Sequence, residues 1–153
     1  MISRVKSGFS LVELLLVLSI MGVMAAIAAP RFGSATSRYR VELAARRVQQ
    51  DLMWARELAQ SKGSPQSVTF TALSGSYTLP GVADPDRKVV SYAVDLTQAP
   101  YQIAMGSADF GNSPTITFSI HGVPSCAGTV VLELGKIVRT VTVHAGSGAV
   151  SVQ

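Results

Sequence analysis

Residues 3–31 read Ser-Arg-Val-Lys-Ser-Gly-Phe-Ser-Leu-Val-Glu-Leu-Leu-Leu-Val-Leu-Ser-Ile-Met-Gly-Val-Met-Ala-Ala-Ile-Ala-Ala-Pro-Arg, and they are the most informative part of the chain. A short basic leader ends at Gly8, and an apolar run of 21 residues extends from Phe9 to Ala29. As a helix this run is roughly 31 Å long, enough to span the hydrocarbon core of a bilayer. Glu13 is the charged residue inside it, and an ionised carboxylate there costs about 2.5–3.5 kcal/mol on insertion scales. Glu13 therefore calls for a partner.

Two plainer interpretations of this segment do not account for Glu13. A secretory signal peptide has an apolar core of about 7–15 residues before a small-x-small cleavage site, and Ala-Ile-Ala at residues 26–28 fits such a site. A plain signal anchor needs only the apolar run and the basic leader, in which Arg4 and Lys6 would hold the N-terminus in the cytoplasm. Neither has a use for a buried carboxylate, so we favour a segment that assembles with others.

Residues 6–13, Lys-Ser-Gly-Phe-Ser-Leu-Val-Glu, resemble the class III signal of type IV pilins and type II secretion pseudopilins. In that family prepilin peptidase cuts after the glycine and methylates the new N-terminal phenylalanine. The resemblance implies cleavage between Gly8 and Phe9 and N-methylation of Phe9. It also implies that Glu13 pairs with the new ammonium group, its own or a neighbour's, because opposite charges attract strongly in a low dielectric.

The same resemblance implies partners and a membrane location. Subunits of the family assemble with other pilins or pseudopilins through the N-terminal helix, on an assembly platform in the inner membrane. Pro30 lies where the family commonly has a proline. Because Pro30 cannot donate to the carbonyl of Ala26, we expect a helix kink or a locally melted segment near residues 26–30, although a tolerated proline at a membrane boundary explains the residue equally well.

A second helical pattern follows Pro30. Its apolar residues recur at spacings of three and four, which is typical of an amphipathic helix with one face on a packed domain. They are Phe32, Ala35, Tyr39, Leu43 or Ala44, Val48, Leu52, Ala55, and Leu58 or Ala59. Lys62 followed by Gly63 predicts the end of the helix, and Trp54 is expected where the helix meets a sheet.

Beyond Gly63 the pattern changes to a period of two with glycine and proline punctuation, which indicates short strands. The predicted strands are 68–70, 77–79, 89–94, 101–103, 116–120, 130–134 and 141–143. The predicted fold is α+β, with a long N-terminal helix, half transmembrane and half amphipathic, packed on an antiparallel β-sheet head of the pilin type. The expected division is leader 1–8, transmembrane and assembly helix 9–29, amphipathic continuation 30–62 and periplasmic head 63–153.

The head resembles that of minor pseudopilins of the GspH/FimT type, in the helix ending 46–62, the strand 67–70, and the segments 116–122, 128–134 and 138–143. The resemblance implies a minor pseudopilin of a type II secretion system. The alternative is a FimT-like minor type IV pilin that serves pilus biogenesis or DNA uptake, in which C-terminal arginines bind DNA. The matching tail, 145–153, has no basic residue, so nucleic acid is not an expected partner.

The charges agree with this interpretation. The net charge is +4, but residues 31–62 hold seven basic and three acidic residues, whereas residues 63–153 hold four and five. The head therefore offers little attraction for phosphate.

No enzymatic site is evident from the sequence. Cys126 is the single cysteine, in a predicted loop, and His121 is its only candidate partner nearby. Asp84-Pro85-Asp86 is better interpreted as a solvated turn than as a calcium site. We therefore expect no catalytic residues, no cofactor and no metal.

Overall fold

A computed structural model describes residues 9–84 and 91–153, and within these it does not describe the side chains of residues 28–32. The leader 1–8, with Arg4, Lys6 and Gly8, lies outside the described residues, as does the predicted strand segment 89–90. Pro85 and Asp86 of the acidic turn also lie outside them. The chain divides into two compact units between Thr36 and Ser37.

Helix α1, Leu11–Lys62, has 52 residues and confirms the long helix predicted for the N-terminal part. Gly63 follows it with a φ of +60°, a left-handed backbone that glycine adopts without strain, so the helix ends where the sequence indicates. The helix is continuous through Pro30, so residues 26–30 are not melted. The kink at Pro30 stays a prediction.

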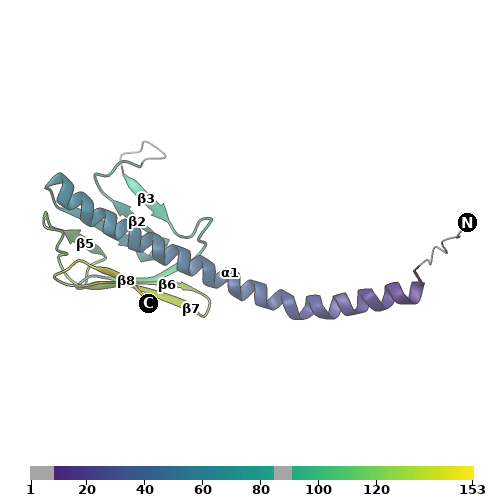
Figure 1. Ribbon diagram of the computed structural model, residues 1–153. Helices are drawn as coiled ribbons and strands as arrows, with labels where there is room; N and C mark the ends of the chain where they lie inside the picture. Colours follow the sequence, from purple (N-terminus) through teal and green to yellow (C-terminus); the bar gives the residue numbers. More distant parts are fainter. Residues whose placement is uncertain (1–8, 85–90) are drawn as a thin grey trace, which may run out of the picture. The chain divides into compact units, whose positions relative to one another are not determined.

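The head contains two antiparallel sheets rather than one (Figure 1). The first has the order β3-β2-β1-β5, and the second has the order β4-β6-β7-β8. The first is built from β1 (Gln66–Thr71), β2 (Ser76–Leu79), β3 (Tyr92–Asp95) and β5 (Thr115–Phe118), and a 3-10 turn, Ala72–Ser74, follows β1. The second is built from β4 (Ala104–Asp109), β6 (Gly128–Leu134), β7 (Ile137–Val143) and β8 (Val150–Val152).

Two details of the strand prediction are wrong. Residues 101–103 form a turn and its exit rather than a strand, and Gln102 has a positive φ of 52° that a strand does not allow. The strand begins directly after them, as β4, and β8 was not predicted at all. Within β4 and β8 only Met105 and Val150 are buried, so neither strand shows a full alternation of apolar and polar residues.

The core lies where α1 meets the inner faces of both sheets. The helix contributes Val41, Ala44, Ala45, Val48, Leu52, Ala55 and Ala59, all fully buried. Ala35 and Tyr39, which the periodicity placed on the buried face, are exposed, because the packed part of the helix begins only at Val41. Phe32 is among the residues whose side chains are not described.

Alternate residues of each sheet face the helix, as the period of two predicts. The first sheet buries Val68, Phe70, Tyr77, Leu79, Tyr92, Ile116 and Phe118, and the second buries Met105, Val130, Leu132, Val141, Val143 and Val150. The helix is fixed to the second sheet as well as the first, since Gln49 Nε2 donates to the carbonyl of Val150 at 2.8 Å. The head is thus one packed unit that holds the second half of α1 rigidly.

Candidate functional site

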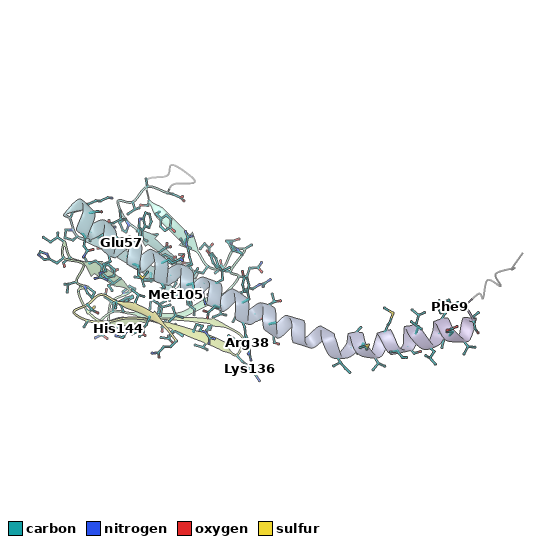
Figure 2. All side chains as sticks on the ribbon, in the orientation of Figure 1. Phe9, Arg38, Glu57, Met105, Lys136 and His144 are labelled. Atoms are coloured by element: carbon teal, nitrogen blue, oxygen red, sulfur yellow. The ribbon has the colours of Figure 1, made fainter. Side chains whose placement is uncertain are left out.

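The first turns of α1 expose a continuous apolar surface. Every large apolar side chain from Leu11 to Ile27 is between 44% and 78% exposed, and Phe9, just before the helix, is 78% exposed (Figure 2). A helix that is apolar on all sides must be covered by lipid or by other helices. This segment therefore has the surface expected of an assembly helix. Among the residues whose side chains are described, which stop at Ile27 and resume at Gly33, no helix is long and apolar enough to cross a membrane.

Glu13 lies in the first turn of α1, with an exposed side chain. An acidic group at this end of a helix is favoured by the partial positive charge of the unpaired N–H groups. Among the described residues Glu13 forms no ion pair. The carboxylate lies at the end of the helix that Phe9 precedes.

A cluster of polar side chains joins α1 to the first sheet. Asp51 is 6% exposed, and its Oδ2 accepts hydrogen bonds from the hydroxyl groups of Tyr77 at 2.5 Å and Tyr92 at 2.9 Å. Arg47 Nε donates to the same oxygen at 3.2 Å, and the Arg47 guanidinium also donates to the Tyr92 hydroxyl. Burial, with the charge of Asp51, raises the pKa of Tyr92 to about 12 and the pKa of Tyr77 well above its ordinary value.

Trp54 completes this contact. Its ring meets the ring of Tyr92 edge to face, with the centroids 5.3 Å apart, and it packs against the core as the sequence predicted. One oxygen of the buried carboxylate thus accepts from three donors, two of them on the first sheet, so the cluster holds the helix on the sheet.

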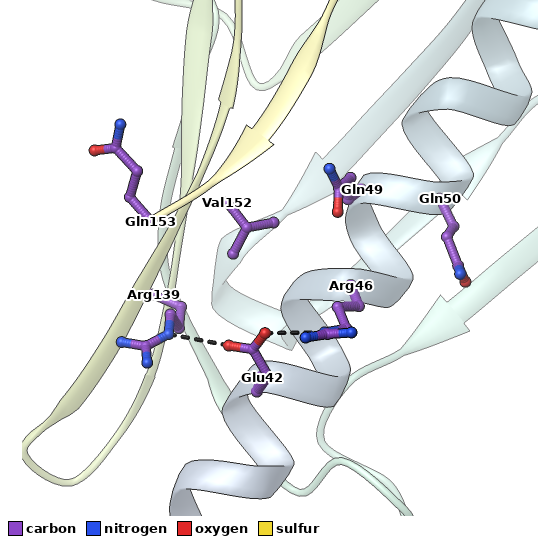
Figure 3. Close-up of a pocket in the computed structure, with 7 residues that line it drawn as sticks. All are labelled: Glu42, Arg46, Gln49, Gln50, Arg139, Val152 and Gln153. Carbon is purple, nitrogen blue, oxygen red and sulfur yellow. Dashed lines mark hydrogen bonds and ion pairs between the residues drawn. The ribbon is translucent and has the colours of Figure 1, made fainter.

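A third polar group lines a hollow of about 680 Å³ between α1 and the strands β7 and β8 (Figure 3). Glu42 is one of its lining residues and accepts from Arg46 Nε at 2.9 Å and from Arg139 Nε at 3.1 Å. The hydrogen bonds from Arg46 and then Arg139 lower the pKa of Glu42. Glu42 and Arg46 are four residues apart, a spacing at which side chains on one helix meet. Arg139 lies 97 residues from Glu42, so no local spacing indicates this second partner.

A neighbouring hollow of about 490 Å³ is basic. Its lining residues are Arg38, Lys136, Ile137, Val138 and Arg139, and Arg139 is shared with the hollow around Glu42. Figure 2 shows Arg38 on α1 beside Lys136, which lies in the turn between β6 and β7. The fold thus brings three cationic side chains from two distant parts of the chain to one edge of the head.

Cys126 and His121, the two residues considered for catalysis, have separate hydrogen-bond partners. Cys126 is half-buried, with Sγ 3.7 Å from Ser125 Oγ, and His121 is exposed, with its carbonyl accepting from Gln60. His144 is also exposed, and its Nε2 lies 3.0 Å from Ser151 Oγ. Within residues 9–84 and 91–153, no three His, Cys, Asp or Glu side chains are grouped so as to hold a metal ion.

Comparisons with known proteins give matches for both the N-terminal segment and the head. The sequence model for the prokaryotic N-terminal methylation motif matches residues 3–29, and the model for the type II transport protein GspH matches residues 44–148. No curated protein matches the sequence significantly.

Solved structures of two proteins share the fold. The minor pseudopilin EpsH from the type 2 secretion system of Vibrio cholerae is 13% identical, with a TM-score of 0.57, and the match covers 74% of this chain and 96% of that one. The type IV minor pilin FimU of Pseudomonas aeruginosa is 17% identical, with a TM-score of 0.59, and the match covers 77% and 91%. At such identities the two structures establish the pilin-like fold and nothing finer.

Proposed function

The chain belongs to the family of the type II transport protein GspH, and from this membership we propose that it is a minor pseudopilin of a type II secretion system. Prepilin peptidase cuts it between Gly8 and Phe9 and methylates Phe9, and the mature subunit enters a periplasmic pseudopilus. The methylation motif at residues 3–29 supports the proposal, because it is the segment that the proposed cleavage and methylation require.

The observation that carries the proposal is the exposed apolar surface from Leu11 to Ile27, with Glu13 in its first turn. In a filament this surface is covered by the helices of other pseudopilins. The carboxylate of Glu13 then pairs with the ammonium group of a methylated Phe9. Each charge would be costly in an apolar phase without the other, so the pair favours subunits in register over any other arrangement.

The location follows from the same segment. Before assembly the helix anchors the subunit in the inner membrane as a single pass, with the N-terminus cytoplasmic and the head periplasmic. The basic leader residues Arg4 and Lys6 support this orientation, because positive charges are retained on the cytoplasmic side. The partners are prepilin peptidase, the inner-membrane assembly platform and the other pseudopilins.

A FimT-like minor type IV pilin is the second candidate, and the likeness to FimU supports it. The TM-score for FimU, 0.59, is as high as the 0.57 for EpsH. The secretion pseudopilus and the type IV pilus use the same N-terminal chemistry. The assignment between them therefore depends on the head. For DNA uptake the tail 145–153 would need cationic groups, and it has none. Failure of the detergent-solubilised chain to bind DNA–cellulose at low salt would count against DNA uptake.

The test of assembly uses the full chain in a host with its secretion apparatus. We expect Glu13→Ala and Glu13→Gln to be processed normally but to co-purify poorly with the other pseudopilins. The matched control is Ser19→Ala, because Ser19 is exposed on the same helix and its hydroxyl donates only to the Leu15 carbonyl of its own helix, at 2.8 Å. Co-purification of both Glu13 variants at the level of the Ser19→Ala control would contradict the proposed pairing.

A further inference from the structure

The arginines that follow the apolar run have no role in the assembly just proposed. Within about twenty residues of Ala29 the chain carries Arg31, Arg38, Arg40, Arg46 and Arg47. Cations near a membrane span are biased toward the cytoplasmic side, although a long domain is translocated regardless of its charge. In the proposed orientation these arginines are on the periplasmic side. The bias of cations toward the cytoplasmic side allows arginines in a translocated domain, but it does not explain why they gather next to the apolar run.

The fold adds cations to this end of the head. The basic hollow, defined by Arg38, Lys136, Ile137, Val138 and Arg139, combines α1 with the turn between β6 and β7. Arg38 and Lys136 are exposed, and Arg46 lies in the adjoining hollow. Glu42, bonded to Arg46 and Arg139, is the carboxylate that these two hollows contain. Glu133 precedes the turn but extends beside Gly106 of β4. The net charge of the side chains around the two hollows is therefore positive.

The rise along α1 limits how far Arg38 can lie from the proposed membrane segment. Arg38 is the second residue of the head unit, and it follows Ala29 by nine helical residues, a rise of at most about 14 Å. The headgroup layer of one leaflet is about 5–8 Å thick. Arg38 therefore lies at most about 9 Å beyond the headgroup layer, which is about one Debye length at physiological salt.

The side chains suit a phospholipid surface. The guanidinium group binds phosphate oxygens with a fork of two N–H donors, and lysine binds them as a point charge. Val138, between Lys136 and Arg139, is 46% exposed, so an apolar side chain accompanies the cations at the turn. A cationic turn with an exposed apolar residue matches the boundary between headgroups and acyl chains.

We propose that the basic hollow binds anionic phospholipid headgroups on the periplasmic face of the inner membrane and holds the head against the bilayer before assembly. The proposal rests on the membrane anchoring proposed above. Entry into a filament then requires that these contacts be released, so the lipid composition of the membrane sets how readily the subunit is recruited.

The experiment uses the full chain reconstituted in vesicles of phosphatidylcholine, with or without phosphatidylglycerol. A fluorophore is placed at residue 138 by Val138→Cys in a Cys126→Ser background, and its contact with the surface is read by a lipid that carries a nitroxide quencher on its headgroup. We expect several-fold more quenching with phosphatidylglycerol, and a loss of the difference at high salt.

Charge-removing variants identify the surface. Arg38→Gln and Lys136→Gln should each lower the apparent association with phosphatidylglycerol about five-fold, as expected for one cation near an anionic membrane. Lys62→Gln is the matched control, because Lys62 is exposed in the last turn of α1, about 36 Å of helix away from Arg38. An equal effect of Lys62→Gln, or quenching that is independent of phosphatidylglycerol, would overturn the proposal.

Two further outcomes separate this proposal from its alternatives. A chain that does not float with phosphatidylcholine vesicles would overturn both the anchoring and the lipid contact, whereas a chain that floats but ignores phosphatidylglycerol would overturn the lipid contact alone. Displacement by short duplex DNA at equal phosphate concentration, with equally tight binding in the absence of vesicles, would assign the surface to nucleic acid and overturn the proposal.

Discussion

The hydroxyl group of Tyr77 on β2 donates a hydrogen bond to Oδ2 of Asp51 on α1, with 2.5 Å between the two oxygen atoms. Both residues are buried, and the same oxygen accepts from Tyr92 and Arg47. A buried donor that loses its charged acceptor costs more than the bond itself contributed. This relationship makes Asp51 the polar residue on which the attachment of helix to sheet most depends.

Replacement of Asp51 should therefore destabilise the head. We expect Asp51→Ala to lower the free energy of unfolding by about 3 kcal/mol, because it leaves the Tyr77 hydroxyl buried without its acceptor. Urea unfolding of the full chain in detergent, followed by the fluorescence of Trp54, measures this, since Trp54 is the single tryptophan. Glu57→Ala, an exposed position on the same helix, should change the free energy by less than about 0.5 kcal/mol. Equal effects of the two variants would contradict the role of Asp51.

The same group predicts a loss of stability at alkaline pH. The folded state keeps Tyr77 and Tyr92 protonated above the ordinary pKa of 10.0, and the pKa of Tyr92 is about 12. Because a raised pKa stabilises the folded state below the unfolded value, this stability is intact below about pH 10 and is lost as the pH rises toward 12. Urea unfolding at a series of pH values should show the decline, and Tyr92→Phe should reduce its steepness. A variant with the unchanged pH profile would exclude Tyr92 as a cause.

Glu42 should matter much less than Asp51. Its side chain is 36% exposed, and its partners Arg46 and Arg139 are 68% and 42% exposed. Ion pairs in contact with water contribute about 0–1 kcal/mol, so we expect Glu42→Gln to cost less than about 1 kcal/mol. The lowered pKa of Glu42 means that this small contribution is present above pH 4.5 and is lost as the pH falls through the folded-state pKa. A cost equal to that of Asp51→Ala would show that water does not screen the pair.

Gly128, the first residue of β6, should not tolerate a side chain. A Cβ atom at this position would lie 2.2 Å from Cδ1 of Phe110 and 2.3 Å from the carbonyl oxygen of Asp109. Phe110 is 1% exposed and stacks on Phe70, so it has little room to move. We expect Gly128→Ala to cost about 1–3 kcal/mol through overpacking. Gly33→Ala, where a Cβ meets nothing within 4 Å, is the control, and an equal loss of stability there would contradict the packing argument.

The sequence was sufficient for the fold where residues alternate strictly. In β5, Ile116 and Phe118 are fully buried between half-buried threonines, and the period of two identifies the strand. In β4 the alternation of buried and exposed residues is lost, because Met105 is the one buried residue of the strand. The register with β6 also shifts between Met105 and Ser107. An edge strand of this kind is recognised only through its hydrogen-bonded partner. The helix face is a similar case, since the periodicity includes Ala35 and Tyr39, whereas the buried face of α1 begins at Val41.

The polar contacts of the head were beyond the sequence. Asp51, Tyr77 and Tyr92 are separated by 26 and 41 residues, so no local spacing brings them together. The hollow that Arg38 lines together with the β6–β7 turn is equally non-local. The N-terminal motif is different, because in the proposed function a peptidase and neighbouring subunits recognise it as a short linear segment, and local sequence is enough to identify it.

The most direct test of the account is the mass of the N-terminal peptide of the protein, recovered from membranes of a host that has a prepilin peptidase. The account predicts a peptide that begins at N-methylated Phe9, since the cut falls between Gly8 and Phe9. A peptide that begins at Met1 would mean a plain membrane anchor, and one that begins near Ala29 would mean a released periplasmic domain. Either result would contradict assembly through the N-terminal helix.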